Sequence, residues 1–189
     1  MTLADLLAAL EAGDTVTAGS PAHATMIQTS EEALRICAEL NRKYDGPERV
    51  RELLGQLTGQ AIDESVTLFP PFTSDFGKNI TIGKRVFINS GCRFQDQGGI
   101  TIGDDSLIGH NAVIATLQHD IEPTRRANVI PFPVIIGRNV WLGANVTVLP
   151  GVTIGDDAVI GAGSVVTKRI PPRTIAVGSP ARVVRAIGE

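Results

Sequence analysis

A period of six residues runs through the second half of the chain and limits the folds open to it. Aliphatic or aromatic residues recur at every sixth position over 82–94, again over 102–114, and then without a break over 136–166. Such a regular period indicates a repeat architecture, in which stacked repeats bury a continuous core. Three hexapeptides, or about 18 residues, would close one triangular coil of three short strands.

The residue after the periodic aliphatic position is usually glycine. This holds at Gly83, Gly103, Gly109, Gly137, Gly143, Gly155 and Gly161. Glycine takes positive φ without a Cβ penalty, so we expect these residues to form the corners between strands.

Composition agrees with a repeat fold whose core is aliphatic. Hydrophobic residues make up 43% of the 189, aromatic residues only 4%, and the 20 Gly and 11 Pro exclude a mainly helical chain. The two cysteines, Cys37 and Cys92, match no metal or redox spacing. No apolar run reaches membrane-spanning length, and the first residues lack the basic start of a signal peptide. We therefore predict a cytoplasmic protein that does not interact with membranes.

Charge is unevenly distributed along the chain. The net charge of −3 argues against a nucleic-acid binder, but residues 164–189 carry five Lys or Arg against one Glu, a net of +4. A basic end on an acidic protein can attract a small anionic ligand.

Residues 1–62 have a helical pattern. The first expected helix has one apolar stripe, formed by Leu3, Leu6, Leu7 and Leu10, and would end at Gly13. Ser30 is a possible cap of a second helix containing Leu34, Cys37 and Tyr44. Pro47 would begin a third helix, with Val50, Leu53, Leu54 and Leu57 on one face. Residues 13–29 are expected to form a loop.

Several segments resemble the hexapeptide-repeat acyltransferases. They include Ile82-Gly83, Ile102-Gly103-Asp104 and the stretches 152–156 and 161–168, the last two similar to the galactoside and maltose O-acetyltransferase branch. The resemblance implies an all-β fold: a left-handed parallel β-helix over 63–189 that follows the small helical segment and assembles as a homotrimer. It implies transfer of acetyl from the co-substrate acetyl-CoA to a hydroxyl of a sugar-like acceptor, with no permanently bound cofactor.

The repeat is interrupted once by a long insertion. Ile114 and Ile136 are 22 residues apart, 16 more than the period, which predicts a protruding loop over 115–133. Long loops in compact domains are commonly functional, and this one contains His119. The family's general-base histidine lies in such a loop, so the resemblance assigns the catalytic base to His119. The branch usually has proline after that histidine, whereas this chain has Asp120.

The other two histidines receive no role from the sequence. His110 falls at a corner of a regular repeat and His23 in a polar N-terminal stretch. With only His110 and His119 in the repeat region, a three-histidine zinc site is not expected, and we predict no metal.

The resemblance also suggests residues that contact the acceptor. Asn89 occupies a corner where glycine is usual, Asp96 lies where the branch has acidic residues, and Trp141 matches a tryptophan beside the catalytic histidine. Asn89 also has a structural explanation, because asparagine tolerates left-handed backbone, and Trp141 could equally be packing at a subunit interface. Thr17 stands where relatives have an acidic residue.

A third set matches the positions that bind acetyl-CoA in the family. Lys168, Arg182 and Arg185 correspond to basic residues near the nucleotide, and Ala144, Ala162 and Thr167 to residues along the pantetheine arm. Arginine suits phosphate through its planar fork and lysine as a mobile point charge.

Strand alternation predicts a row of outward apolar residues. If the periodic positions point inward, Phe87, Leu107, Val113, Ile135, Trp141, Val159 and Val165 point out. So many exposed apolar side chains favour a trimer that covers them. Two alternatives remain open: the same chemistry on an antibiotic hydroxyl or an amine, and a non-catalytic β-solenoid scaffold.

Overall fold

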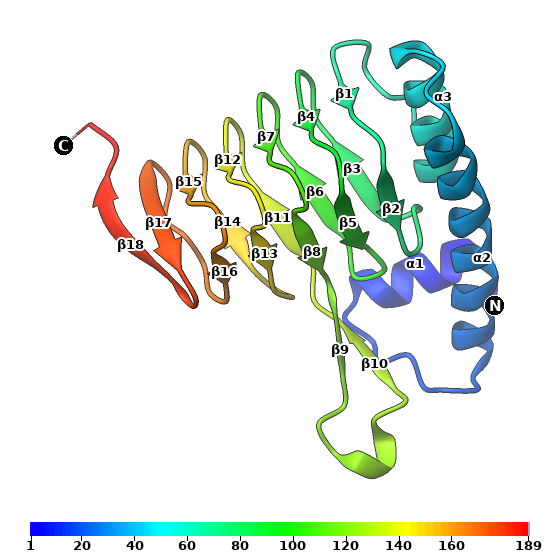
Figure 1. Cartoon of the computed structure of the whole chain (residues 1–189). Coiled ribbons are helices and arrows are strands. Elements are labelled where there is room, and N and C mark those ends of the chain that lie inside the picture. The colour runs from blue at the N-terminus through cyan, green and yellow to red at the C-terminus, as the bar shows by residue number, and fades with distance from the viewer. Residues whose placement is uncertain (189) are drawn as a thin grey trace.

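The computed structural model describes residues 1–188 as three helices followed by a β-helix and a protruding hairpin (Figure 1). The helices are α1 (Leu3–Glu11), α2 (Pro21–Arg42) and α3 (Pro47–Thr58). They lie at the N-terminal end of the β-helix, where α2 contacts β2 (Phe72–Ser74) and α3 contacts β1 (Thr67–Leu68). None of the helices within 1–188 is long and apolar enough to cross a membrane.

The first and third helices follow the predicted stripes. Leu6 and Leu10 of α1 are buried, and all four predicted positions of α3 are buried. Thr2 caps α1 in a capping box with Asp5, and Gly59 ends α3 with a left-handed backbone.

The prediction for the second helix was wrong at its start. The helix begins at Pro21 and is capped by Ser20, whose side chain accepts the backbone N–H of His23, so Ser30 lies inside it. Its buried face contains Met26, Thr29, Ala33, Cys37 and Leu40, while Leu34 is exposed and Tyr44 lies beyond the helix end. Threonine and alanine give a weak apolar signal, which hid the first turns of this helix.

The β-helix has three parallel sheets, one on each side of the triangular coil. Sheet I contains β1, β4 (Phe87–Ile88), β7 (Leu107–Ile108), β12 (Trp141–Leu142), β15 (Val159–Ile160), β17 (Thr174–Gly178) and, antiparallel at its end, β18 (Ala181–Ala186). Sheet II contains β3 (Ile80–Ile82), β6 (Ile100–Ile102), β11 (Val134–Ile136) and β14 (Thr153–Ile154). Sheet III contains β2, β5 (Cys92–Gln95), β8 (Val113–Ala115), β13 (Thr147–Val148) and β16 (Val165–Val166). The chain visits sheet I, then III, then II in each coil.

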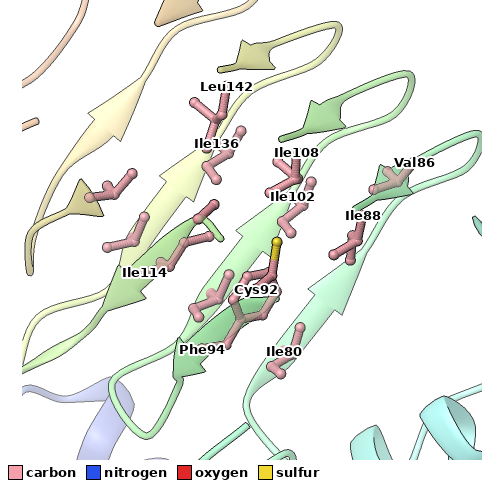
Figure 2. Packing of buried hydrophobic residues seen from close by; sticks show 14 of the residues in the cluster. Ile80, Val86, Ile88, Cys92, Phe94, Ile102, Ile108, Ile114, Ile136 and Leu142 are labelled. Carbon is pink, nitrogen blue, oxygen red and sulfur yellow. The ribbon is translucent and has the colours of Figure 1, made fainter. Parts of the chain in front are cut away.

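The periodic aliphatic residues form the core of this coil. Ile88, Ile108, Ile114, Leu142 and Val148 are fully buried, and Figure 2 shows such side chains pointing into the space between the sheets. Parallel registers such as Phe87↔Leu107 and Trp141↔Val159 stack equivalent positions of successive coils. The outward residues are part-buried or exposed, as predicted.

The reason predicted for the corner glycines was wrong. None of the seven has positive φ; that conformation falls two residues later, at Asp105, Asn111, Asn139 and their equivalents. The glycines are needed because adjacent coils touch there: a Cβ on Gly109 would lie 2.7 Å from the carbonyl carbon of Gly143. Stacking distance, rather than backbone conformation, therefore selects glycine.

The predicted loop over 115–133 is a β-hairpin. Its strands are β9 (Leu117–His119) and β10 (Val129–Pro131), and the 3-10 turn η1 (Pro123–Arg125) lies at the tip. It projects well clear of the β-helix (Figure 1).

Candidate active site

A groove of about 490 Å³ runs along the outer face of sheet I. Outward residues of β4, β7, β12 and β15, together with the corners after these strands, form its walls. The lining residues are Phe87, Asn89, Leu107, Ile108, Gly109, His110, Trp141, Gly143, Ala144, Val159, Ile160, Gly161 and Ala162.

Trp141 is at the centre of this apolar surface. Its backbone is paired with Leu107 on one side and Val159 on the other, and its side chain is 55% exposed. The structure thus brings Trp141, Asn89, Ala144 and Ala162, four of the residues predicted from the sequence, into one groove. An apolar channel with few polar groups suits an extended ligand with an aliphatic arm.

Asn89 meets a histidine to which the sequence gave no role. Its Nδ2 lies 3.2 Å from Nδ1 of His110, while its Oδ1 accepts the backbone N–H of Ser90 at 2.9 Å. Equivalent positions on β4 and β7 are 20 residues apart, so the corner containing His110 stacks directly on the corner containing Asn89. That spacing could have revealed the pair.

His119 lies on the hairpin, exposed, with one ring nitrogen engaged. Its Nδ1 is 2.8 Å from the carbonyl oxygen of Arg126. A carbonyl oxygen only accepts, so Nδ1 must carry the proton and Nε2 retains a free lone pair in the neutral ring. A histidine in this state can accept a proton at Nε2.

Asp120, which replaces the usual proline, closes the hairpin tip. Its carboxylate accepts the backbone N–H of Glu122 at 2.9 Å and pairs with Arg125 at 2.8 Å. The Glu122 N–H, followed by Arg125, lowers the pKa of this carboxyl. Asp120 therefore rigidifies the segment that follows His119.

The histidine and the groove belong to different sides of the same chain. The hairpin leaves the coil between β8 of sheet III and β11 of sheet II, the edge opposite sheet I. His119 does not line the groove. One chain by itself therefore does not bring the two together.

Asp96 is fully buried and likewise does not line the groove. Its Oδ1 accepts the Ser74 hydroxyl at 2.7 Å and the Phe76 backbone N–H at 3.0 Å, and within the described residues its Oδ2 has no hydrogen-bond partner. Burial raises the pKa of this carboxyl to about 6 against the opposing effect of those hydrogen bonds. Its observed contacts are structural.

The basic residues lie on two edges of the β-helix. Thr167 and Lys168 follow β16 at the edge between sheets III and II, the edge from which the hairpin also leaves. Arg182 and Arg185 lie on β18, which ends sheet I, and all three basic side chains are exposed. Within residues 1–188, no group of three or more His, Cys, Asp or Glu is arranged to hold a metal.

Two family models match the repeat region. Residues 79–116 match the hexapeptide repeat of succinyl-transferase, and residues 133–168 match the bacterial transferase hexapeptide (six repeats). The gap between them contains the hairpin.

Known proteins match over most of the chain. The galactoside O-acetyltransferase of Escherichia coli K12 is 39% identical over 153 residues, covering 80% of this chain and 75% of that protein. The crystal structure of a maltose O-acetyltransferase from Clostridium difficile 630 has a TM-score of 0.88 at 36% identity, covering 97% of each chain. A hexapeptide-repeat-containing acetyltransferase from Vibrio cholerae, complexed with acetyl-coenzyme A, has a TM-score of 0.83 at 32% identity over the full length of both chains.

The hexapeptide repeats, the three-sided coil and the similarity to known acetyltransferases over nearly the whole chain all point to one family. They confirm the family and the β-helix that were expected from the sequence. The chain belongs to the hexapeptide-repeat acyltransferases, in the galactoside and maltose O-acetyltransferase branch, and is an acetyltransferase.

Proposed function

We propose that the chain transfers the acetyl group of acetyl-CoA to a hydroxyl of a sugar or sugar-like acceptor, with His119 as general base. The observation that carries the proposal is the state of His119 on the exposed hairpin: its Nδ1 lies 2.8 Å from the Arg126 carbonyl oxygen, and its Nε2 has no hydrogen-bond partner among residues 1–188. Two of the relatives named above are a galactoside and a maltose O-acetyltransferase, and the third is an acetyltransferase in complex with acetyl-CoA.

In this reaction the acceptor oxygen attacks the thioester carbonyl carbon while Nε2 of His119 removes the hydroxyl proton. The carbon–sulfur bond then breaks, and the imidazolium returns the proton to the departing coenzyme A thiolate. The Arg126 carbonyl fixes the ring and stabilises the transient positive charge at Nδ1. A positioned base of this kind contributes about 10²–10⁴-fold.

The groove on sheet I would hold the pantetheine arm and the acceptor. Ala144 and Ala162 leave room for the arm along the corners, and Asn89 and Trp141 offer an amide and an aromatic face to the acceptor. Lys168, Arg182 and Arg185 would meet the phosphates. Asp96 is fully buried, with its carboxylate bound to Ser74 and Phe76, so we do not propose it as an acceptor contact.

The opposite placement of hairpin and groove supports a site shared between subunits. In a threefold assembly, the hairpin edge of one chain can face sheet I of its neighbour and cover the exposed apolar side chains there. Lys168 would then come from the chain that supplies His119, and Arg182 from the chain that supplies the groove.

Subunit mixing tests the shared site. His119→Ala removes the base, and Ala162→Trp fills the groove at an exposed position; each homotrimer should be inactive. After unfolding together in equal amounts and reassembly, about a quarter of sites should have both wild-type halves if a cyclic trimer mixes at random. A His119→Ala, Ala162→Trp double variant mixed with either parent is the control and should recover nothing. Inactive mixed trimers would place both halves in one chain, and a monomer would end the proposal.

The acceptor is tested with a panel of galactosides, maltose, aminoglycosides and hydroxylated antibiotics, by following release of free thiol from acetyl-CoA. Turnover of sugars alone supports the proposal, whereas turnover of antibiotics or amines alone would reassign the acceptor. A chain that neither binds nor turns over acetyl-CoA would be a β-solenoid scaffold.

A further inference from the structure

The segment before α2 pairs with the hairpin through one isolated antiparallel β-bridge, between Val16 and Val129. The N–H of Val16 donates to the carbonyl of Val129 at 2.9 Å, and the N–H of Val129 donates to the carbonyl of Val16 at 3.1 Å. Two residues on, the N–H of Ala18 donates to Oδ1 of Asn128 at 3.0 Å. These bonds connect positions more than 100 residues apart in sequence.

Val129 is also the cross-strand partner of His119 in the hairpin. An isolated two-stranded hairpin is marginally stable, and a third strand or a packed face is needed to fix it. The backbone hydrogen bonds between Val16 and Val129 therefore hold the strand that is paired directly with His119.

A small hydrophobic core supports the same junction. Leu6 and Leu10 of α1, Val16, Met26, Phe76 and Val129 are buried together, apart from the core of the β-helix, and Leu117 packs against them. Val16 is only 2% exposed and Val129 only 7%. This core joins α1 to the base of the hairpin.

Asp96 anchors the floor of this core. Phe76, which is completely buried in it, has its backbone N–H bound by the Asp96 carboxylate, and the same oxygen accepts the Ser74 hydroxyl. The buried Asp96 carboxylate thus links the corner after β5 to Phe76, the residue that is buried together with Val16 and Val129.

We propose that residues 2–18 form a clamp that positions the catalytic hairpin, with Val16 and Asn128 as positioning residues for His119. The inference rests on the proposed base role of His119. The clamp fixes the position and direction of β9 and β10 relative to the β-helix. It therefore also fixes where Nε2 of His119 meets the groove of a neighbouring subunit. A misplacement of about 1 Å in a reacting group can cost about 10²-fold in rate, so clamp variants should lose turnover while acetyl-CoA binding persists.

Two variants weaken the clamp without touching the hairpin strand that carries His119. Asn128→Ala removes the acceptor for Ala18 and should lower kcat about tenfold with the KM for acetyl-CoA within about twofold. Asn128→Asp keeps an acceptor oxygen and should restore most of the loss. Val16→Pro removes the donor to Val129 and should lower kcat more strongly, by up to about 10²-fold.

Leu53→Ala in α3 is the control for lost stability. Its side chain is buried far from the hairpin, so it should lower Tm and leave kcat unchanged at temperatures where the protein is folded. Deuterium exchange of peptides covering 117–131 gives a readout that does not depend on activity. Exchange there should be faster in Asn128→Ala and Val16→Pro and unchanged in Leu53→Ala.

The outcomes separate the clamp from the base. Faster hairpin exchange with lower kcat, reversed in Asn128→Asp, supports the clamp. Unchanged hairpin exchange and unchanged kcat in both clamp variants, alongside an inactive His119→Ala protein, would overturn the clamp and leave the base intact. An active His119→Ala protein would overturn the base, and with it the assignment of Val16 and Asn128 as positioning residues.

Discussion

The side chains of Asn89 and His110 are bonded to each other across two successive coils, with Nδ2 of the amide 3.2 Å from Nδ1 of the ring. Ser90 donates its backbone N–H to the Asn89 Oδ1, which fixes the amide so that Nδ2 faces the histidine. Nδ1 of His110 therefore accepts, and its proton is on Nε2. The corner of the groove presents an oriented amide rather than a freely rotating one.

This pair predicts coupled effects on the acceptor. Asn89→Ala should lower kcat/KM for the acceptor about tenfold, and His110→Ala somewhat less, since it frees the amide without removing it. In a double-mutant cycle, His110→Ala should add little in the Asn89→Ala background. Additive losses in steady-state kinetics would mean that His110 acts independently of Asn89.

Replacing the proposed base should affect turnover and spare binding. His119→Ala is expected to lower kcat by about 10²–10⁴-fold, with the Kd for acetyl-CoA unchanged in calorimetry. Gln118→Ala, at the adjacent exposed position of β9, is the matched control and should retain activity. A His119→Ala protein with most of its activity would remove His119 from the mechanism.

The basic residues should distinguish donors by their phosphates. Lys168→Ala and Arg182→Ala are each expected to raise the KM for acetyl-CoA about tenfold, and to raise it much less for a dephospho-analogue. The exposed Arg169 next to Lys168 offers the control Arg169→Ala. Equal losses with both donors would show that the two residues act on folding or elsewhere.

The buried carboxyl of Asp96 predicts a pH-dependent stability. Its pKa is raised from 3.8 to about 6, so the folded protein binds this proton more tightly than the unfolded chain does. Proton binding at Asp96 therefore adds to the free energy of unfolding. This contribution is complete below pH 3.8 and is lost as the pH rises through about 6, which lowers the free energy of unfolding by about 3 kcal/mol. Asp96→Asn does not titrate here, so the unfolding free energy of the wild type should fall relative to it by about that amount between pH 4 and pH 7. Parallel pH profiles in urea titrations would contradict the shift.

The sequence by itself determined the coil and its inward and outward faces. The six-residue period predicts which side chains enter the core, and it correctly predicted that Leu107, Ile135 and Trp141 point outward. It also placed the insertion that forms the hairpin, because an interruption of a regular period is visible without any structure. The apolar stripe of α3 was read in the same way.

Predictions based on the expected role of a single residue type succeeded less well. The corner glycines looked like positive-φ residues, but only the stacked coils reveal how closely Gly109 approaches Gly143. Ser30 resembled a helix cap because the buried face of α2 contains residues as polar as Thr29. For the glycines the deciding contact lies with another coil, whereas the start of α2 is set locally by the cap at Ser20 and by Pro21.

Only the tertiary structure decided what each polar residue touches. Asp96 matched an acceptor residue by position, but the fold turns its carboxylate onto Phe76, and His110 acquires Asn89 as a partner because coil lengths align their corners. The pairing of Val16 with Val129 left no trace in local periodicity, since it joins segments separated by most of the chain. Periodicity records whether a side chain faces in or out; which side chains meet depends on how the coils, the hairpin and the N-terminal segment pack in three dimensions.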